Sequence, residues 1–165
     1  MGKFTEDEIA QSYAYYGVQL SGVEPKQIGP LEDVILAVIE NPPPGRFITT
    51  IPPLIIKNEE LNLHKLLKNI KEHKEYGPRL GYILDMTLEC AKRLPVKERA
   101  HVTERIKEVL KHLKPSKQPE KWMPEKLGQL YEAKPKEEHE IKWNVVTSYG
   151  FKRFEDHFDS YVKYA

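Results

Sequence analysis

Apolar residues recur at intervals of three and four through most of the chain, and this spacing is typical of amphipathic α-helices. It predicts helices over about 6–16, 30–40, 51–57, 63–75, 79–94, 96–113 and 150–164, with 124–133 as a further candidate for a short helix. The clearest stripe is the one over 96–113, formed by Val96, Ala100, Thr103, Ile106, Leu110 and Leu113. We therefore expect a mainly α fold, a single-core bundle of five to seven helices.

Start and stop signals support several of these boundaries. Thr5 and Glu8 match a capping box, in which each side chain bonds the backbone amide of the other residue. Pro30 suits the first turn of a helix, and the three prolines of segment 41–45 end that helix because proline cannot continue it. Pro95 separates the two helices of the middle of the chain.

The segment 140–148 has a different pattern, which is rich in β-formers and partly alternating. Ile141, Trp143 and Val145 would lie on one face of a strand, so we expect a minor β element there. A single strand is not stable alone. It would pair either with the segment Phe47–Ile51 or with a partner chain.

The domain organisation follows from a linker rich in lysine and proline after Leu113. We expect residues 1–114 to form a helical domain. Residues 115–165 would then form the linker and a C-terminal strand–helix extension, packed on the same core.

Composition excludes several classes of protein. The 165 residues are 39% hydrophobic and 31% charged, with a net charge of +1. No apolar run has the length of about 20 residues that a membrane span needs, and the acidic N-terminus does not resemble a signal peptide. One cysteine, Cys90, excludes an intramolecular disulfide and a multi-cysteine zinc site. We expect a cytoplasmic protein that does not bind membranes.

Catalytic motifs are absent from the sequence. The six histidines form no HExxH pair, and neither a P-loop nor a GxGxxG fingerprint is present. Cys90 falls near the apolar face of a helix, which favours an inert core thiol. His157 follows Asp156 directly, and adjacent residues of a helix point about 100° apart, so the carboxylate does not orient the imidazole. We expect no enzyme activity, no cofactor and no metal site.

Aromatic residues gather in the two terminal helices. Their number exceeds what two short helices need for internal packing, and tyrosine and phenylalanine are favoured in protein interfaces. Core packing is the alternative for the same residues. The candidate partner-binding residues are Tyr13, Tyr16, Phe151, Phe154, Phe158 and Tyr161.

A basic segment, 92–121, offers a rival function. Residues 86–121 carry ten basic against five acidic side chains, whereas residues 1–63 carry four against nine. Clustered cations beside an aromatic ring could bind phosphates and stack a base. The candidates are Arg93, Arg99, Arg105, Lys107, Lys111, Lys114 and Trp122. Interleaved glutamates support the alternative of a salt-bridged, solvated helix, and the charge asymmetry also leaves self-association open.

Four stretches together resemble the C-terminal region of AbiEi-like antitoxins, over roughly residues 30–150. They are 30–42, the helix 63–75 from Leu66-Leu67 onward, Arg79–Asp85 and Trp143–Val146. The resemblance implies a protein that neutralises a nucleotidyltransferase-like toxin. Members of this family usually carry an N-terminal winged helix for DNA, and residues 1–29 are too short and acidic to form one. We therefore expect a non-enzymatic, protein-binding helical module, with nucleic-acid binding through 92–121 as the alternative.

Overall fold

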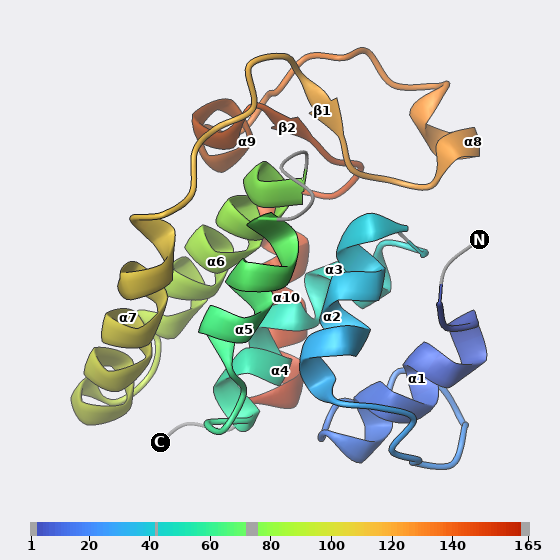
Figure 1. The fold of residues 1–165 in the computed structure, drawn as a ribbon, viewed down its shortest axis with the longest axis vertical. Helices are drawn as coiled ribbons and strands as arrows, with labels where there is room; N and C mark the ends of the chain where they lie inside the picture. Colours follow the sequence, from blue (N-terminus) through green and yellow to red (C-terminus); the bar gives the residue numbers. More distant parts are fainter. Residues whose placement is uncertain (1–2, 42, 72–75, 163–165) are drawn as a thin grey trace.

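The computed structural model describes residues 3–41, 43–71 and 76–162, which form a mainly helical fold (Figure 1). The longer helices are α1 (Glu6–Tyr15), α2 (Leu31–Glu40), α4 (Ile51–Lys57), α5 (Leu63–Lys71), α6 (Gly77–Ala91), α7 (Val96–Leu110) and α10 (Phe151–Tyr161). The short elements are the helices α3 (Arg46–Thr49), α8 (Glu125–Gly128) and α9 (Glu138–Trp143) and the strands β1 (Glu120–Lys121) and β2 (Val145–Val146). The predicted fold class is confirmed, since the described ranges contain seven helices of seven residues or more and a minor β element.

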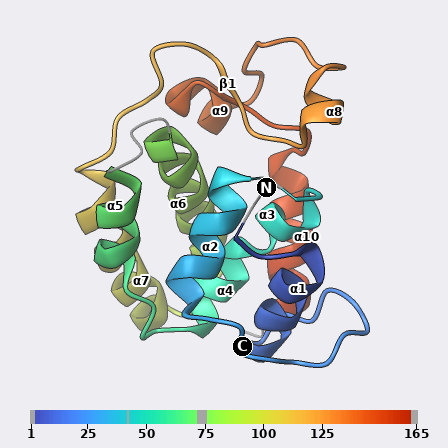
Figure 2. The same ribbon diagram turned by 45° about the vertical axis from the view of Figure 1, so that its right-hand side comes forward.

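Helix α6 lies at the centre of the bundle, and α4, α5, α7, α9 and α10 pack around it (Figures 1 and 2). Its sequence accounts for this position. Leu80, Ile83 and Leu84 share one face of the helix, Tyr82 and Met86 lie on the opposite face, and all five side chains are buried. A helix that is apolar around most of its circumference is stable only where other elements surround it.

Local signals locate several helices correctly. The hydroxyl of Thr5 accepts a hydrogen bond from the amide of Glu8, and the Glu8 carboxylate accepts one from the amide of Thr5, which completes the predicted capping box of α1. The helix predicted over 51–57 is α4, with prolines in its first turn. For the predicted helix 63–75, residues 72–75 lie outside the described residues, as do 163 and 164 at the end of helix 150–164.

The strand predicted over 140–148 is wrong for most of its length. Residues Glu138–Trp143 form helix α9, and only Val145–Val146 form a strand. A capping box between Glu137 and Glu140 starts the helix, and Asn144 ends it in the left-handed conformation (φ 57°). As a result, Ile141 is 62% exposed and Trp143 is buried, although both were expected on the same face of a strand.

The expected pairing of this strand with Phe47–Ile51 is also wrong, because that segment lies in α3 and α4. β2 instead pairs in parallel with β1, with Val145 opposite Glu120 and Val146 opposite Lys121. β1 lies in the segment rich in lysine and proline that was predicted to be a linker. Together with α8 and α9, the two strands cover one end of the bundle, at the top of Figure 1.

One hydrophobic core joins both predicted regions of the chain. It includes Ile35, Leu54 and Ile83 from the first 114 residues, and Trp122 and Phe154 from the remainder. Among the described residues, no helix is both long enough and apolar enough to cross a membrane.

Candidate binding groove between α6, α7 and α9

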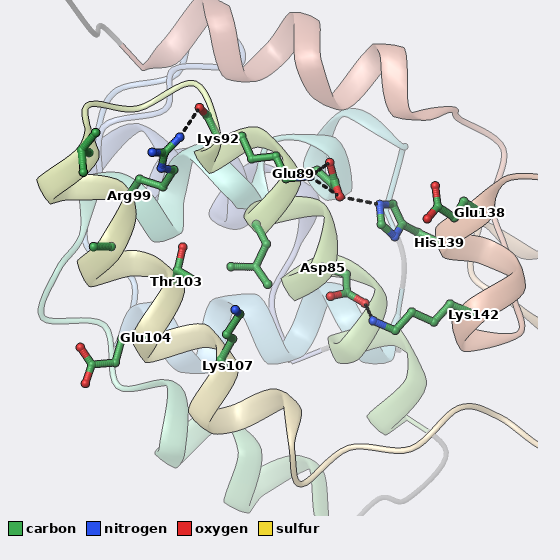
Figure 3. Close-up of a pocket in the computed structure, with 13 residues that line it drawn as sticks. Asp85, Glu89, Lys92, Arg99, Thr103, Glu104, Lys107, Glu138, His139 and Lys142 are labelled. Atoms are coloured by element: carbon green, nitrogen blue, oxygen red, sulfur yellow. Dashed lines mark hydrogen bonds and ion pairs between the residues drawn. The ribbon is translucent and has the colours of Figure 1, made fainter.

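An open groove of about 940 Å³ lies between α6, α7 and α9 (Figure 3). The exposed side of α6 forms its floor through Asp85, Leu88, Glu89 and Lys92. These four residues are spaced by three, one and three positions, so they share one face of the helix. We call this depression the α6–α7–α9 groove.

Helix α7 forms one wall of the groove with a stripe that is partly apolar. Val96, Ala100 and Thr103 follow each other at helical spacing, and Arg99 and Lys107 flank them. The side chain of Val96 is 69% exposed, although it is a large apolar residue. An apolar strip between charged side chains is typical of a surface that meets another molecule.

Helix α9 forms the opposite wall, and Trp143 fixes its position on α6. The indole ring lies directly on Gly81, where an added Cβ would be only 2.3 Å from the nearest ring atom. The indole N–H also donates a hydrogen bond to the carboxylate of Asp85, at 2.6 Å. Gly81 and Asp85, one helical turn apart on α6, therefore form the packing site for this ring.

The loops beside α9 are held by a second set of buried polar contacts. The Glu140 carboxylate is buried and accepts hydrogen bonds from the amide and the hydroxyl of Thr147. Arg79, also buried, donates to the carbonyl of Ile39 and to the Glu120 carboxylate of β1. The Arg79 contacts join the segment that carries β1, α9 and β2 to the main bundle, and the Glu140 contacts hold the end of that segment against α9.

The acidic side chains of the floor form ion pairs with basic side chains of the groove. Asp85 accepts from the ammonium of Lys142 at 2.7 Å, in addition to Trp143. Glu89 pairs with Lys92 at 3.0 Å, and the Nε2 atom of His139 lies 3.6 Å from its other carboxylate oxygen. Figure 3 shows the contacts of Lys142 and His139 crossing from α9 to α6.

The arrangement offers little for nucleophilic catalysis. A hydroxyl nucleophile needs a base within hydrogen-bond reach, and the Nε2 atom of His139, the histidine of the groove, lies 3.6 Å from a carboxylate oxygen of Glu89. The described residues also contain no group of three metal-ligating side chains. Burial raises the pKa of the Cys90 thiol to about 12, which disfavours the reactive thiolate.

The predicted partner-binding aromatics do not form a common surface. Tyr13, Phe154 and Phe158 are fully buried in the core, so the prediction that these three meet a partner is corrected to core packing. The Tyr13 hydroxyl donates to the carbonyl of Phe47, which joins α1 to α3. The other three residues, Tyr16, Phe151 and Tyr161, are partly buried against the same core.

The predicted nucleic-acid residues are dispersed and partly engaged. Trp122 is completely buried, so the expected base stacking on its ring is wrong. Arg93 pairs with Glu155 and Asp159 of α10, and Lys111 pairs with Glu108. The remaining candidates differ in position: Arg105 donates to the carbonyl of Leu61, Arg99 and Lys107 line the groove, and Lys114 is exposed after α7.

His157, considered above as an acid–base candidate, has a structural role between α10 and α3. Its Nδ1 atom lies 2.6 Å from the hydroxyl of Thr49. Burial lowers the pKa of His157 below its ordinary value of 6.5, and the charge of Arg153 lowers it further, whereas Asp156 acts in the opposite direction. The folded protein therefore holds this ring in its neutral form more strongly than the unfolded chain does.

Acidification is accordingly expected to destabilise the fold through His157. As the pH falls below about 6.5, His157 of the unfolded chain becomes protonated at a higher pH than His157 of the folded protein. The free energy of unfolding therefore falls as the pH falls through the interval between the unfolded and folded pKa values. In His157→Gln, the free energy of unfolding should depend less steeply on pH between about pH 7 and 5. Urea denaturation at several pH values measures both slopes, and parallel slopes for the two proteins would contradict this assignment.

No family model, curated protein or solved structure matches the chain. The groove was not predicted from the sequence, because its α9 wall lies far along the chain from the consecutive helices α6 and α7. One local signal could have indicated part of it. On one face of the helix, Gly81 leaves space for a ring and Asp85 offers a hydrogen-bond acceptor. This combination suits a tryptophan, which must bury its ring and satisfy its N–H.

Proposed function

We propose that the protein is a non-enzymatic, protein-binding module whose α6–α7–α9 groove receives a segment of a partner protein. The observation that supports this most strongly is the exposed apolar strip of Val96 and Ala100 beside Leu88, enclosed by charged side chains. Protein interfaces combine an apolar centre with a polar rim in this way. The volume of about 940 Å³ is at the upper end of the range for small-molecule pockets, and the groove is open along its length.

The contacts inside the groove favour binding over bond-breaking. Asp85 and Glu89 are neutralised by ion pairs with Lys142 and Lys92, which leaves them poor candidates for a general base. The Asp85–Lys142 pair also joins α9 to the floor. A preformed surface loses less entropy when a partner binds.

The resemblance to AbiEi-like antitoxins suggests the class of partner, a nucleotidyltransferase-like toxin. Two of the stretches that carry the resemblance meet at the groove: Arg79–Asp85 contributes Asp85 to the floor, and Trp143 of Trp143–Val146 fixes the α9 wall. The proposal thus places the part of the chain that resembles the family beside the proposed binding surface.

Ala100→Arg tests the proposed function, because it places a long charged side chain on an exposed position of the apolar strip. We expect affinity capture from a nuclease-treated lysate of the native host, read by mass spectrometry, to recover a partner with the wild type and at least tenfold less with Ala100→Arg. The stability of the variant should stay within about 0.5 kcal/mol of the wild type, as for other surface substitutions.

The matched control is Ala133→Arg, the same substitution at an exposed alanine that does not line the groove. It should recover the partner as the wild type does. Equal capture by both arginine variants would contradict the proposal. A partner recovered only when the nuclease is omitted would support the nucleic-acid alternative instead.

A further inference from the structure

We infer that the segment bound in the α6–α7–α9 groove is an amphipathic helix with two carboxylates two turns apart, which pair with Arg99 and Lys107. This inference rests on the proposed function and specifies the chemistry of the partner. It follows from the charges that remain in the groove once its internal ion pairs are counted.

The α7 wall retains positive charge, whereas the acidic side chains of the floor are compensated. Asp85 is paired with Lys142 and Glu89 with Lys92. Among the described residues, Lys107 has no carboxylate partner, and Arg99 donates to a backbone oxygen, the carbonyl of Lys92, at 3.4 Å. The two cations of α7 are therefore available to acidic groups of a partner.

The positions of the two cations define a spacing. Arg99 and Lys107 are eight residues apart in one helix, which corresponds to about 12 Å along its axis. Thr103 lies between them, and Figure 3 shows Lys107 directed toward α6 while Glu104 points away on the outer side of α7. On a partner helix that lies along α7, acidic residues at positions i and i+7 are about 10.5 Å apart along the axis, which brings both within reach of the long side chains of Arg99 and Lys107.

The floor of the groove favours a helix over an extended peptide. Leu88 of α6 and Ala100 of α7 lie inside helices whose backbone groups bond within each helix, so this part of the groove offers apolar side chains and no free edge of a sheet. An extended peptide buried there would leave backbone N–H and C=O groups without partners. A helical segment satisfies its own backbone and can present an apolar face to the strip.

The α9 wall adds a requirement on the other flank of the partner. Glu138, in the first turn of α9, lines the groove and has no ion-pair partner among the described residues. A lysine or arginine on the flank facing α9 would complement this carboxylate. The expected segment is thus acidic toward α7, apolar toward α6 and basic toward the start of α9.

Three synthetic helical peptides with one common apolar face test this inference. The first carries glutamate at i and i+7, the second glutamine and the third lysine, and fluorescence anisotropy measures their dissociation constants. We expect the wild type to bind the glutamate peptide at least tenfold more tightly than the glutamine peptide, with a smaller preference at high salt. Arg99→Glu/Lys107→Glu should reverse the order and prefer the lysine peptide.

The matched control is Lys65→Glu/Lys68→Glu, which makes the same change in net charge at exposed lysines of α5. It should keep the wild-type preference. Equal affinities of the wild type for the glutamate and glutamine peptides, or the same reversal in the control, would overturn the inference. If Ala100→Arg still abolishes capture of a partner in that case, the proposed function stands and only the described helix is wrong.

Discussion

Replacement of Gly81 by alanine is expected to lower the free energy of unfolding by about 3 kcal/mol, at the upper end of the cost of overpacking a core. Alanine normally stabilises a helix interior by about 1 kcal/mol relative to glycine. Here the sign is reversed because the new Cβ would lie 2.3 Å from a carbon of the Trp143 ring, well inside van der Waals contact. Urea denaturation followed by circular dichroism measures the difference.

Gly22→Ala is the control for this prediction, because nothing lies within 4 Å of a Cβ added at Gly22. Its stability should stay within about 0.5 kcal/mol of the wild type. In a Trp143→Leu background, Gly81→Ala should cost much less, since the ring that occupies the space is gone. An unchanged or higher stability of Gly81→Ala in the wild-type background would show that the ring does not lie on Gly81.

Trp143→Ala is expected to be the most destabilising substitution near the groove, at about 4 kcal/mol. Trp143 is only 4% exposed, its ring packs against α6, and its N–H satisfies the carboxylate of Asp85. The variant would leave a cavity and an Asp85 carboxylate bonded to Lys142 alone. Because α9 would lose the packing of the Trp143 ring on α6 and keep only its polar contacts there, capture of the partner should also fall.

Trp143→Phe separates the two contributions of the tryptophan. Phenylalanine keeps an aromatic ring but cannot donate to Asp85, so we expect a loss of about 1–2 kcal/mol. Denaturation curves of the two variants give the comparison. If Trp143→Phe lowered the free energy of unfolding as much as Trp143→Ala does, the hydrogen bond to Asp85 rather than the packing on Gly81 would be the main contribution of Trp143 to stability. The proposed packing of the ring on Gly81 would then need revision.

Much of the helical bundle could be predicted because its signals are local. The capping box of Thr5 and Glu8 and the prolines of segment 41–45 act within one or two turns of the chain. The strand over 140–148 was wrong because alternation of Ile141, Trp143 and Val145 competes with a second capping box, formed by Glu137 and Glu140. Over so short a segment, the two patterns cannot be separated by periodicity alone.

The groove could not be predicted because it depends on contacts between distant segments. Lys142 reaches Asp85 and His139 reaches Glu89 only after α9 has folded back over α6. Whether the aromatic residues of α10 are buried also depends on contacts between distant segments. Phe154 and Phe158 lie at helical spacing on α10, and this spacing does not distinguish core packing from a partner-binding face; in the folded protein both are buried against α4 and α6.

Site-specific photo-crosslinking in the native host tests the proposed binding surface most directly. A photoreactive amino acid replaces Val96, the most exposed large apolar residue of the groove, and in a second protein replaces Lys65 on α5. If the α6–α7–α9 groove binds a partner protein, position 96 should give a covalent product with a different protein, and position 65 should give none. Products of equal yield from both positions, or only a product with a second copy of this chain from position 96, would contradict it.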